Sequence, residues 1–195
     1  MSESFINQEV QNENPTPPPA SRVCLPRESF ETVMTDEIVE YSCRLDKMCG
    51  VTSGPCTGNN GTICDGACNY PNACTYNQGD IQSCSCLGEE ACSENKGDIG
   101  LFACNGKSVC KKNTASIGML SCNGNSKTCH DNRADVSHES CNGFRSCFEN
   151  KGKISFKSCN KDKSCQANRG AVSEKSCNGN ESCSKNSGSI GANSW

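Results

Sequence analysis

An 18-residue motif recurs along most of this chain and constrains its fold more than any other feature. Each copy begins at an Ile or Val that is followed five residues later by Cys, except the last copy, where Trp195 stands in place of Cys. The copies begin at Ile63, Ile81, Ile99, Ile117, Val136, Ile154, Val172 and Ile190, so every step is 18 residues except one of 19. A fixed short period is typical of proteins in which each repeat buries its inner surface only against its neighbours.

We number the positions of each copy from its Ile or Val. Cys occupies positions 6 and 12, Asn occupies position 15, and Gly or Ala occupies position 17. Position 5 is nearly always Ser or Ala, which suits a narrow interior. In the 19-residue copy the two Cys are seven residues apart instead of six, and its later positions are counted from the second Cys. The consensus is I-G-x-x-S-C-N-G-x-x-S-C-x-x-N-x-G-x.

The length of the repeat decides between helical and β architectures. Eighteen residues are too few for a helical pair, which takes about 33 or more, but suit one turn of a β-helix. Asn-Gly often follows the first Cys, and Asn-x-Gly follows the second. Both predict corners in which Asn and Gly adopt positive φ angles. The sequence therefore predicts an all-β fold, a disulfide-laddered β-solenoid (β-helix) of about seven to eight 18-residue coils, with its handedness open.

Disulfides must take over much of the role of an apolar core. The chain has 20 Cys among 195 residues, and only 27 residues are Leu, Ile, Val or Phe. Bonded cysteines have Cα atoms about 4.4 to 6.8 Å apart, which residues six apart reach only if the chain doubles back. We therefore favour bonds within each coil over bonds between neighbouring coils. The predicted pairs are Cys68/Cys74, Cys86/Cys92, Cys104/Cys110, Cys122/Cys129, Cys141/Cys147, Cys159/Cys165 and Cys177/Cys183.

The pairing of the other six cysteines stays open. These are Cys24, Cys43, Cys49, Cys56, Cys64 and Cys84. Cys49 and Cys56 fit a degenerate first coil, and Cys43 with Cys49 is the rival pairing. Cys64 and Cys84 sit on adjacent coils, which predicts a staple between them and leaves Cys24 to pair with Cys43.

The Asn at position 15 has two interpretations. Stacked Asn side chains can bond amide to amide along the axis, as in cross-β ladders. Alternatively, Asn is there only because it tolerates a left-handed corner.

Composition divides the chain into three parts. Residues 1–22 are rich in Pro and polar residues and predict a disordered leader. Residues 23–48 predict a small N-terminal cap, and residues 49–195 form the Cys-rich repeats. The last coil ends at Trp195, so we expect either self-association through the C-terminal coil or a longer array.

No motif indicates catalysis, a cofactor or a resident metal. The sequence has no G-x-S-x-G, Walker loop or H-E-x-x-H motif, and C-x5-C spacing does not suit zinc. His130 and His138 lie near Asp131 and Asp135, where surface polarity explains them better than metal binding. Asn60 and Asn180 are the two candidate glycosylation sites.

Charge and cysteine content limit the partners and the compartment. A net charge of −3 gives no electrostatic footprint for nucleic acid, and no apolar run is long enough to span a membrane. Twenty paired cysteines require an oxidising compartment, although residues 1–10 do not resemble a secretory signal. We therefore expect an extracellular or cell-surface protein whose given N-terminus is incomplete.

The segments SCNGNSKTC, SCNGFRSC, SCNGNESC and NSGSIGANS in residues 63–195 resemble a group of largely uncharacterised Cys-rich repeat proteins of diatoms and related algae. This resemblance implies a surface or wall protein and no particular activity. The C-x5-C coil is also similar to the disulfide-stapled antifreeze solenoids of insects. Those bind ice through regular Thr-x-Thr columns, which this chain lacks.

Two classes of function remain after these exclusions. The favoured one is a non-enzymatic structural or adhesive protein that presents a rigid surface to polysaccharide, mineral or sibling repeat proteins. The alternative is an ice-binding-type or other ligand-binding solenoid, for which positions 9, 10, 13 and 14 vary too much. A metal-binding Cys-rich protein is a third, weaker interpretation.

Overall fold

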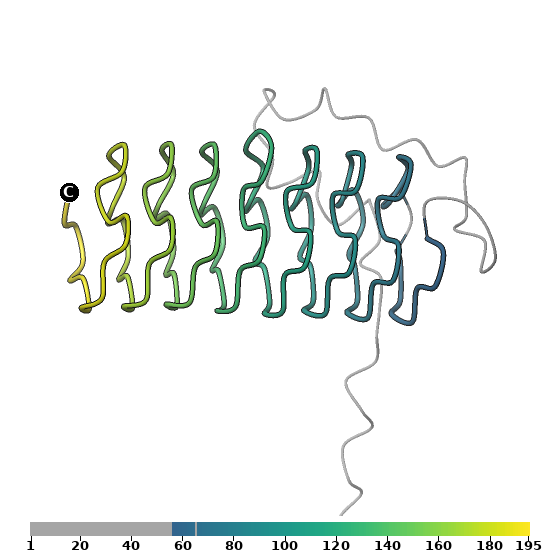
Figure 1. Cartoon of the computed structure of the whole chain (residues 1–195), viewed down its shortest axis with the longest axis horizontal. Coiled ribbons are helices and arrows are strands. Elements are labelled where there is room, and N and C mark those ends of the chain that lie inside the picture. The colour runs from purple at the N-terminus through teal and green to yellow at the C-terminus, as the bar shows by residue number, and fades with distance from the viewer. Residues whose placement is uncertain (1–55, 65) are drawn as a thin grey trace, which may run out of the picture.

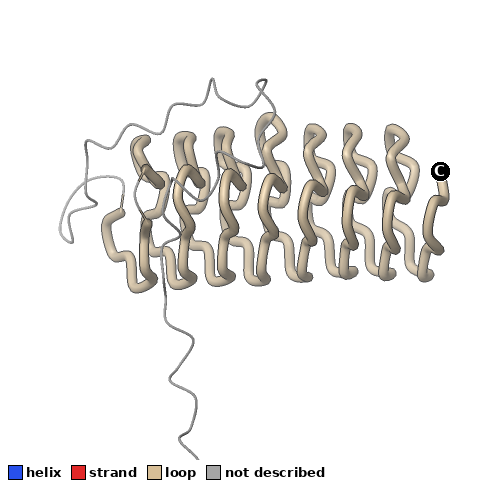
Figure 2. The backbone as a smooth tube through the Cα atoms, turned by 180° about the vertical axis from the view of Figure 1, so that it is seen from behind, coloured by secondary structure: helices blue, strands red, loops and turns tan. Residues whose placement is uncertain are grey.

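In the computed structural model, which describes residues 56–64 and 66–195, the chain winds through a row of similar coils (Figure 1). The described residues form no helix and no strand, only turns, bends and isolated bridges (Figure 2). One parallel β-bridge joins each coil to the next at position 1. These bridges are Ile63–Ile81, Ile81–Ile99, Ile99–Ile117, Ile117–Val136, Val136–Ile154, Ile154–Val172 and Val172–Ile190. Strand content is therefore one bridged residue per coil.

Backbone hydrogen bonds between neighbouring coils continue around the circumference. At position 1, the Ile99 N–H donates to the Asp80 carbonyl oxygen at 2.8 Å. At position 6 the Cys104 N–H donates to Ser121, and at position 16 the Lys96 N–H donates to Asn113. The coils thus stack in a fixed register although no long strand forms.

The corners are not built as the sequence predicted. Four residues in each regular coil have positive φ, at positions 4, 6, 10 and 14, and position 6 is the first Cys. The Asn and Gly of the Asn-Gly and Asn-x-Gly segments are not among the positive-φ residues, so their predicted role is wrong. An L-residue in this conformation costs roughly 1–2 kcal/mol, which surrounding contacts must offset.

Glycine at position 17 is explained by close packing instead. A Cβ built on Gly97 would overlap the carbonyl oxygen of Ala115 in the next coil. Gly152 and Gly170 meet the next coil in the same way. Glycine therefore lets adjacent coils approach, rather than supplying an unusual backbone angle.

The interior consists of narrow columns of small and medium side chains. Positions 1, 5, 6, 12 and 15 are buried in most coils, as the repeat predicted. Position 11 forms a further buried column that the sequence analysis did not identify. Its buried members are Ala73, Ala91, Val109, Thr128, Ser146 and Ser164. No side chain larger than Ile is needed to fill these columns.

The 19-residue coil keeps the interior register by placing its extra residue outside. The bridge from Ile117 to Val136 is intact, and Cys122 and Cys129 have Cα atoms 5.9 Å apart. The exposed Asn125 lies in the widened segment between these cysteines. Figure 1 shows this segment as the largest loop, near the middle of the row. The predicted leader at 1–22 and cap at 23–48 lie outside the described residues.

Candidate functional site: inner ladders and outer rows

Each predicted C-x5-C pair is bonded within its own coil. The seven bonds are Cys68–Cys74, Cys86–Cys92, Cys104–Cys110, Cys122–Cys129, Cys141–Cys147, Cys159–Cys165 and Cys177–Cys183. Their Cα atoms are 5.6 to 5.9 Å apart, within the usual range for a disulfide. Fourteen cysteines thus form a ladder of cystines along the interior.

The predicted staple between Cys64 and Cys84 is wrong. Both residues are disulfide-bonded, but the bonds that join two described residues do not include one between them. In register, Cys64 faces Gln82, whose Oε1 lies 3.9 Å from its Sγ. Cys84 is therefore two residues out of register with Cys64. Cys56 is also disulfide-bonded, while the proposed partners Cys24, Cys43 and Cys49 lie outside the described residues.

The Asn column at position 15 is a continuous amide ladder, which settles the alternative that the sequence left open. The Asn150 Nδ2 donates to the Asn132 Oδ1 at 2.9 Å and to its own Gly152 carbonyl at 2.7 Å. The same pair of bonds recurs at every described coil, from Asn77 to Asn186. The ladder also reaches Asn59, in the degenerate first coil.

Two further polar columns were not predicted. At position 7, the Asn123 Oδ1 accepts the Asn105 N–H, and the Asn123 Nδ2 donates to the Phe102 carbonyl. At position 5, the Ser158 hydroxyl donates to the Ser173 carbonyl at 2.9 Å and accepts the Ser176 N–H. The sequence signal was the recurrence of Asn and Ser, which we had assigned to corners and to small size.

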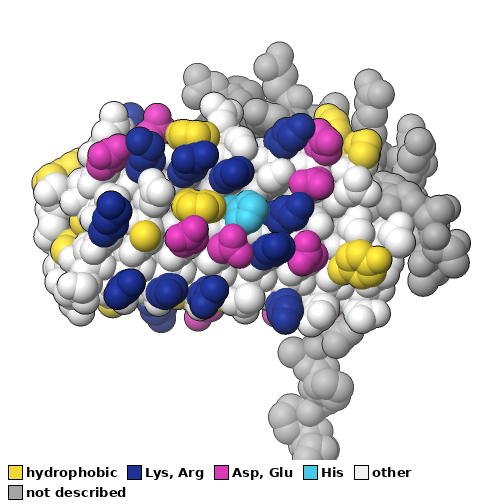
Figure 3. Space-filling view, viewed as in Figure 1, with side chains coloured by type: hydrophobic (Ala, Val, Ile, Leu, Met, Phe, Trp, Pro, Cys, Tyr) yellow, Lys and Arg dark blue, Asp and Glu magenta, His cyan; other side chains and the backbone are white. Residues whose placement is uncertain are grey.

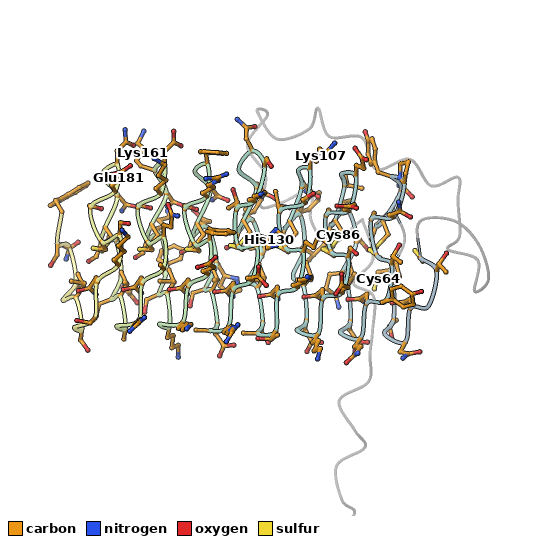
Figure 4. The ribbon with its side chains drawn as sticks, in the orientation of Figure 1. Cys64, Cys86, Lys107, His130, Lys161 and Glu181 are labelled. Carbon is orange, nitrogen blue, oxygen red and sulfur yellow. A yellow bond between two sulfur atoms is a disulfide. The ribbon has the colours of Figure 1, made fainter. Side chains whose placement is uncertain are left out.

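His130 belongs to a small aromatic and cationic cluster on the face in Figure 4. Its ring meets Phe148 edge-on at 5.7 Å, and the Arg145 guanidinium lies over the Phe148 ring. Burial lowers the pKa of His130, and the nearby Asp131 carboxylate opposes this shift. His130 Nε2 lies 3.1 Å from Asp131 Oδ2, so the histidine takes part in a structural contact rather than a group of converging ligands.

Charged side chains on neighbouring coils form outer ion pairs. Lys107 pairs with Glu89 at 2.7 Å, and Lys163 pairs with Glu181 at 2.9 Å. The hydrogen bond from Lys111 lowers the pKa of Glu90. Because the Lys107–Glu89 and Lys163–Glu181 pairs are well exposed, each adds little to stability.

A shallow groove runs along the outer side of the position 1 column. Its floor includes Gly100 and Gly118, and Asp98 and Asp135 stand along one side. The aspartates accept backbone N–H groups of the preceding coil, as Asp135 does from Ser116 at 3.2 Å. On the other side, His138 Nδ1 accepts the Met119 N–H, so both predicted histidines are engaged within the protein.

The two candidate glycosylation residues lie at the surface. Asn60 and Asn180 are both exposed, so an attached sugar would meet no buried neighbour at either residue.

Three groups of cysteines bring their sulfur atoms within 4.8 Å of one another, for example Cys129 with Cys141 and Cys147. All of these sulfurs are in disulfides, which are not thiolate metal ligands. The part of the chain that the structure describes contains no helix able to span a membrane.

A row of basic residues occupies position 16, which the sequence analysis did not single out. Arg133, Lys151 and Arg169 follow one another on three consecutive coils, and all three are exposed. Lys96 occupies the same position two coils before Arg133. Lys and Arg side chains lie side by side along the lower edge of the face in Figure 3. The sequence could have shown this row, because position 16 is the variable residue of Asn-x-Gly and is basic in three consecutive copies.

Together, the columns and the seven regular disulfides define a disulfide-rich tandem-repeat protein. The chain matches the family model described as Domain of unknown function (DUF7640) over residues 35–143 and 126–195, and it belongs to this family. Searches of the curated proteins and of the solved structures found no significant match. The first match begins before residue 49, so the family model includes part of the segment that we expected to be a cap.

Proposed function

We propose that this chain is a non-enzymatic structural or adhesive protein of the cell surface or wall, folded as a disulfide-laddered β-solenoid that presents a rigid outer surface. The observation that carries this proposal is the ladder of seven within-coil disulfides beside a continuous Asn ladder. Such an interior resists bending and requires an oxidising environment to form. The likeness to diatom and algal repeat proteins points to the same setting.

The outer surface supports presentation of a binding surface more than catalysis. The groove beside position 1 has aspartates whose oxygens already accept backbone N–H groups. His130 and His138 are each held by contacts within the coils. An acid, a base and a nucleophile that converge on one point, as enzymatic hydrolysis requires, are not brought together by these residues.

The ice-binding alternative needs a flat face of identical residues, and the outer rows do not supply one. Position 14 changes from Glu94 to Lys112, Asp131 and Glu149 in successive coils. Position 13 includes Lys111, His130 and Phe148. Variable outer rows on a constant interior favour recognition of a polymer or of a sibling protein.

Antibody labelling of intact cells that produce the protein tests this proposal. Labelling without permeabilisation, lost after brief protease treatment of the living cells, is the expected result. Labelling only after permeabilisation, with the cysteines reduced in the extracted protein, would contradict a surface role. A purified oxidised protein that hydrolyses a polysaccharide substrate would contradict the non-enzymatic assignment.

A further inference from the structure

The backbone at position 16 is fixed by hydrogen bonds to the next coil. The backbone N–H of Arg133 donates to the Asn150 carbonyl, and that of Lys151 donates to the Asn168 carbonyl, both at 2.8 Å. Arg169 is bonded to Asn186 in the same way. The backbone of each basic residue is therefore bonded to the backbone of a residue whose side chain belongs to the Asn ladder. We call Arg133, Lys151 and Arg169 the basic row.

The basic row is a straight line of similar charges. Bridged backbones lie about 4.8 Å apart, so the three Cα atoms extend over roughly 10 Å along the axis. None of the three side chains forms an ion pair with any residue that the structure describes. By contrast, Lys107, Lys111, Lys157 and Lys163 are each paired with a carboxylate on an adjacent coil.

The neighbouring rows change sign along the array. At position 18, Asp80, Asp98 and Asp135 precede Lys153. At position 14, Asp131 and Glu149 lie on the other side of the basic row. The basic row and Lys153 thus place four cations on three consecutive coils, with Asp131, Asp135 and Glu149 beside them, whereas the earlier coils carry only Lys96 at position 16. The whole chain has a net charge of −3, so this run of cations is a local feature of the later coils.

We propose that the basic row, with Lys153 beside it, binds a linear anionic polysaccharide that carries carboxylate or sulfate groups. This inference rests on the proposed surface function and names its partner. A rigid line of cations with a fixed repeat matches a polymer whose charges also recur along a line. Arg binds carboxylate and sulfate in bidentate fashion, whereas Lys binds as a point charge, so both sources of anion suit the row.

Single-stranded nucleic acid is the other polyanion that a basic row could accept. Proteins that bind it combine the cations with aromatic side chains on which bases stack. No aromatic residue occupies position 14, 16 or 18 in the coils that carry the basic row. The disulfides also require an oxidising compartment, whereas the cytosol and nucleus, which hold nucleic acids, are reducing. The observations therefore favour polysaccharide.

Binding of the oxidised full chain to immobilised heparin and to polygalacturonate tests the proposal, with neutral dextran as the reference polymer. The test variant combines Arg133→Gln, Lys151→Gln and Arg169→Gln. The control combines Lys161→Gln, Lys175→Gln and Lys185→Gln, which removes the same charge from exposed residues at three unrelated positions. Both variants leave the interior columns unchanged, so circular dichroism should match the parent protein.

We expect salt-dependent binding to at least one anionic polymer and none to dextran. In the test variant the affinity at low salt should fall about tenfold or more, and the slope of log affinity against log salt should fall by about 2. In the control variant the slope should fall by less than a third of that amount. Heparin and polygalacturonate distinguish sulfate from carboxylate as the preferred anion.

Three outcomes would overturn the inference. Equal losses in the two variants would show general charge attraction without a site. Tighter binding to a single-stranded oligonucleotide than to either polysaccharide would assign the row to nucleic acid. Binding to dextran but not to the anionic polymers would exclude the basic row as a binding site and would not affect the proposed surface function. Labelling only inside the cells would exclude the surface function itself.

Discussion

The interior and the outer surface of the coils follow different rules. Inside, positions 1, 6, 12 and 15 keep one side-chain chemistry from coil to coil, as the Asn ladder from Asn77 to Asn186 shows. Outside, a single row can change from Glu94 to Lys112 to Asp131 within two coils. The interior Asn side chains bond to their own copies in adjacent coils, so a change in one affects two neighbours. The outer side chains have no such requirement, which leaves them free to vary with function.

The 19-residue coil shows the same difference between interior and outer surface within one repeat. Its extra residue would break every ladder if it were placed inside. Instead, Asn132 still donates to Asn113 at 2.8 Å, and Ser121 still accepts the Ser140 N–H at 3.1 Å. The outer loop alone becomes longer. Insertions are thus tolerated where the coil has no interior partner.

Reduction of the disulfides should destabilise the interior more than any other change. A bond that closes so short a loop contributes about 2 kcal/mol in the chain-entropy account. Seven such bonds together match the ~5–15 kcal/mol that typically stabilises a domain. We expect full reduction to abolish the native circular dichroism spectrum at room temperature. A spectrum that survives complete reduction and alkylation would show that the Asn and Ile columns suffice.

Asn150→Ala should be the most damaging single change among the polar columns. It removes the bonds to Asn132 and Gly152 and the acceptor for Asn168. Buried groups left without partners cost about 1–3 kcal/mol each, so we expect a loss of about 3–5 kcal/mol in the free energy of unfolding. Guanidinium unfolding of the oxidised protein measures it. Asn125→Ala, on the exposed loop, is the control and should change stability by less than about 0.5 kcal/mol.

Ser158→Ala should cost less than Asn150→Ala. The hydroxyl donates to the Ser173 carbonyl and accepts the Ser176 N–H, so two backbone groups lose a partner. The column already contains Ala103, which fits its narrow space. We expect a loss of about 1–3 kcal/mol by the same unfolding measurement. Ser184→Ala, at the outer position 13, should be close to neutral, and an equal loss there would contradict the distinction between columns and rows.

The smallest expected effect is the contribution of His130, on the outer surface, to the pH dependence of stability. The His130 pKa is lowered from its ordinary value of 6.5, chiefly by burial. As pH falls below 6.5, the unfolded chain therefore binds a proton before the folded one, and stability decreases until the folded imidazole is also protonated. His130→Gln should remove this part of the decrease between about pH 7.5 and pH 5. Identical pH profiles for the two proteins would exclude His130 as its source.

The sequence predicted the stacking period and the within-coil disulfides because both depend on spacing alone. It could not predict which residues take positive φ, since the side chain at position 6 is Cys and carries no turn signal. Asn-Gly suggested a corner, but in the coils its Asn is required for a side-chain ladder, as at Asn123. The basic row was missed because position 16 also holds the uncharged residues Gln78, Thr114 and Ser187, so no basic residue entered the consensus. Recognising it required the copies to be aligned and known to be exposed.

Disulfide mapping of the native protein tests the central claim most directly. Free thiols are first blocked, the unreduced protein is digested between successive coils, and the disulfide in each peptide is located by mass spectrometry. We predict essentially no blocked cysteine and a peptide that links Cys141 to Cys147, with the equivalent link in each regular coil. Links between neighbouring coils, such as Cys147 to Cys159, or cysteines that are mostly free or bound to zinc, would contradict a rigid interior built from one cystine per coil.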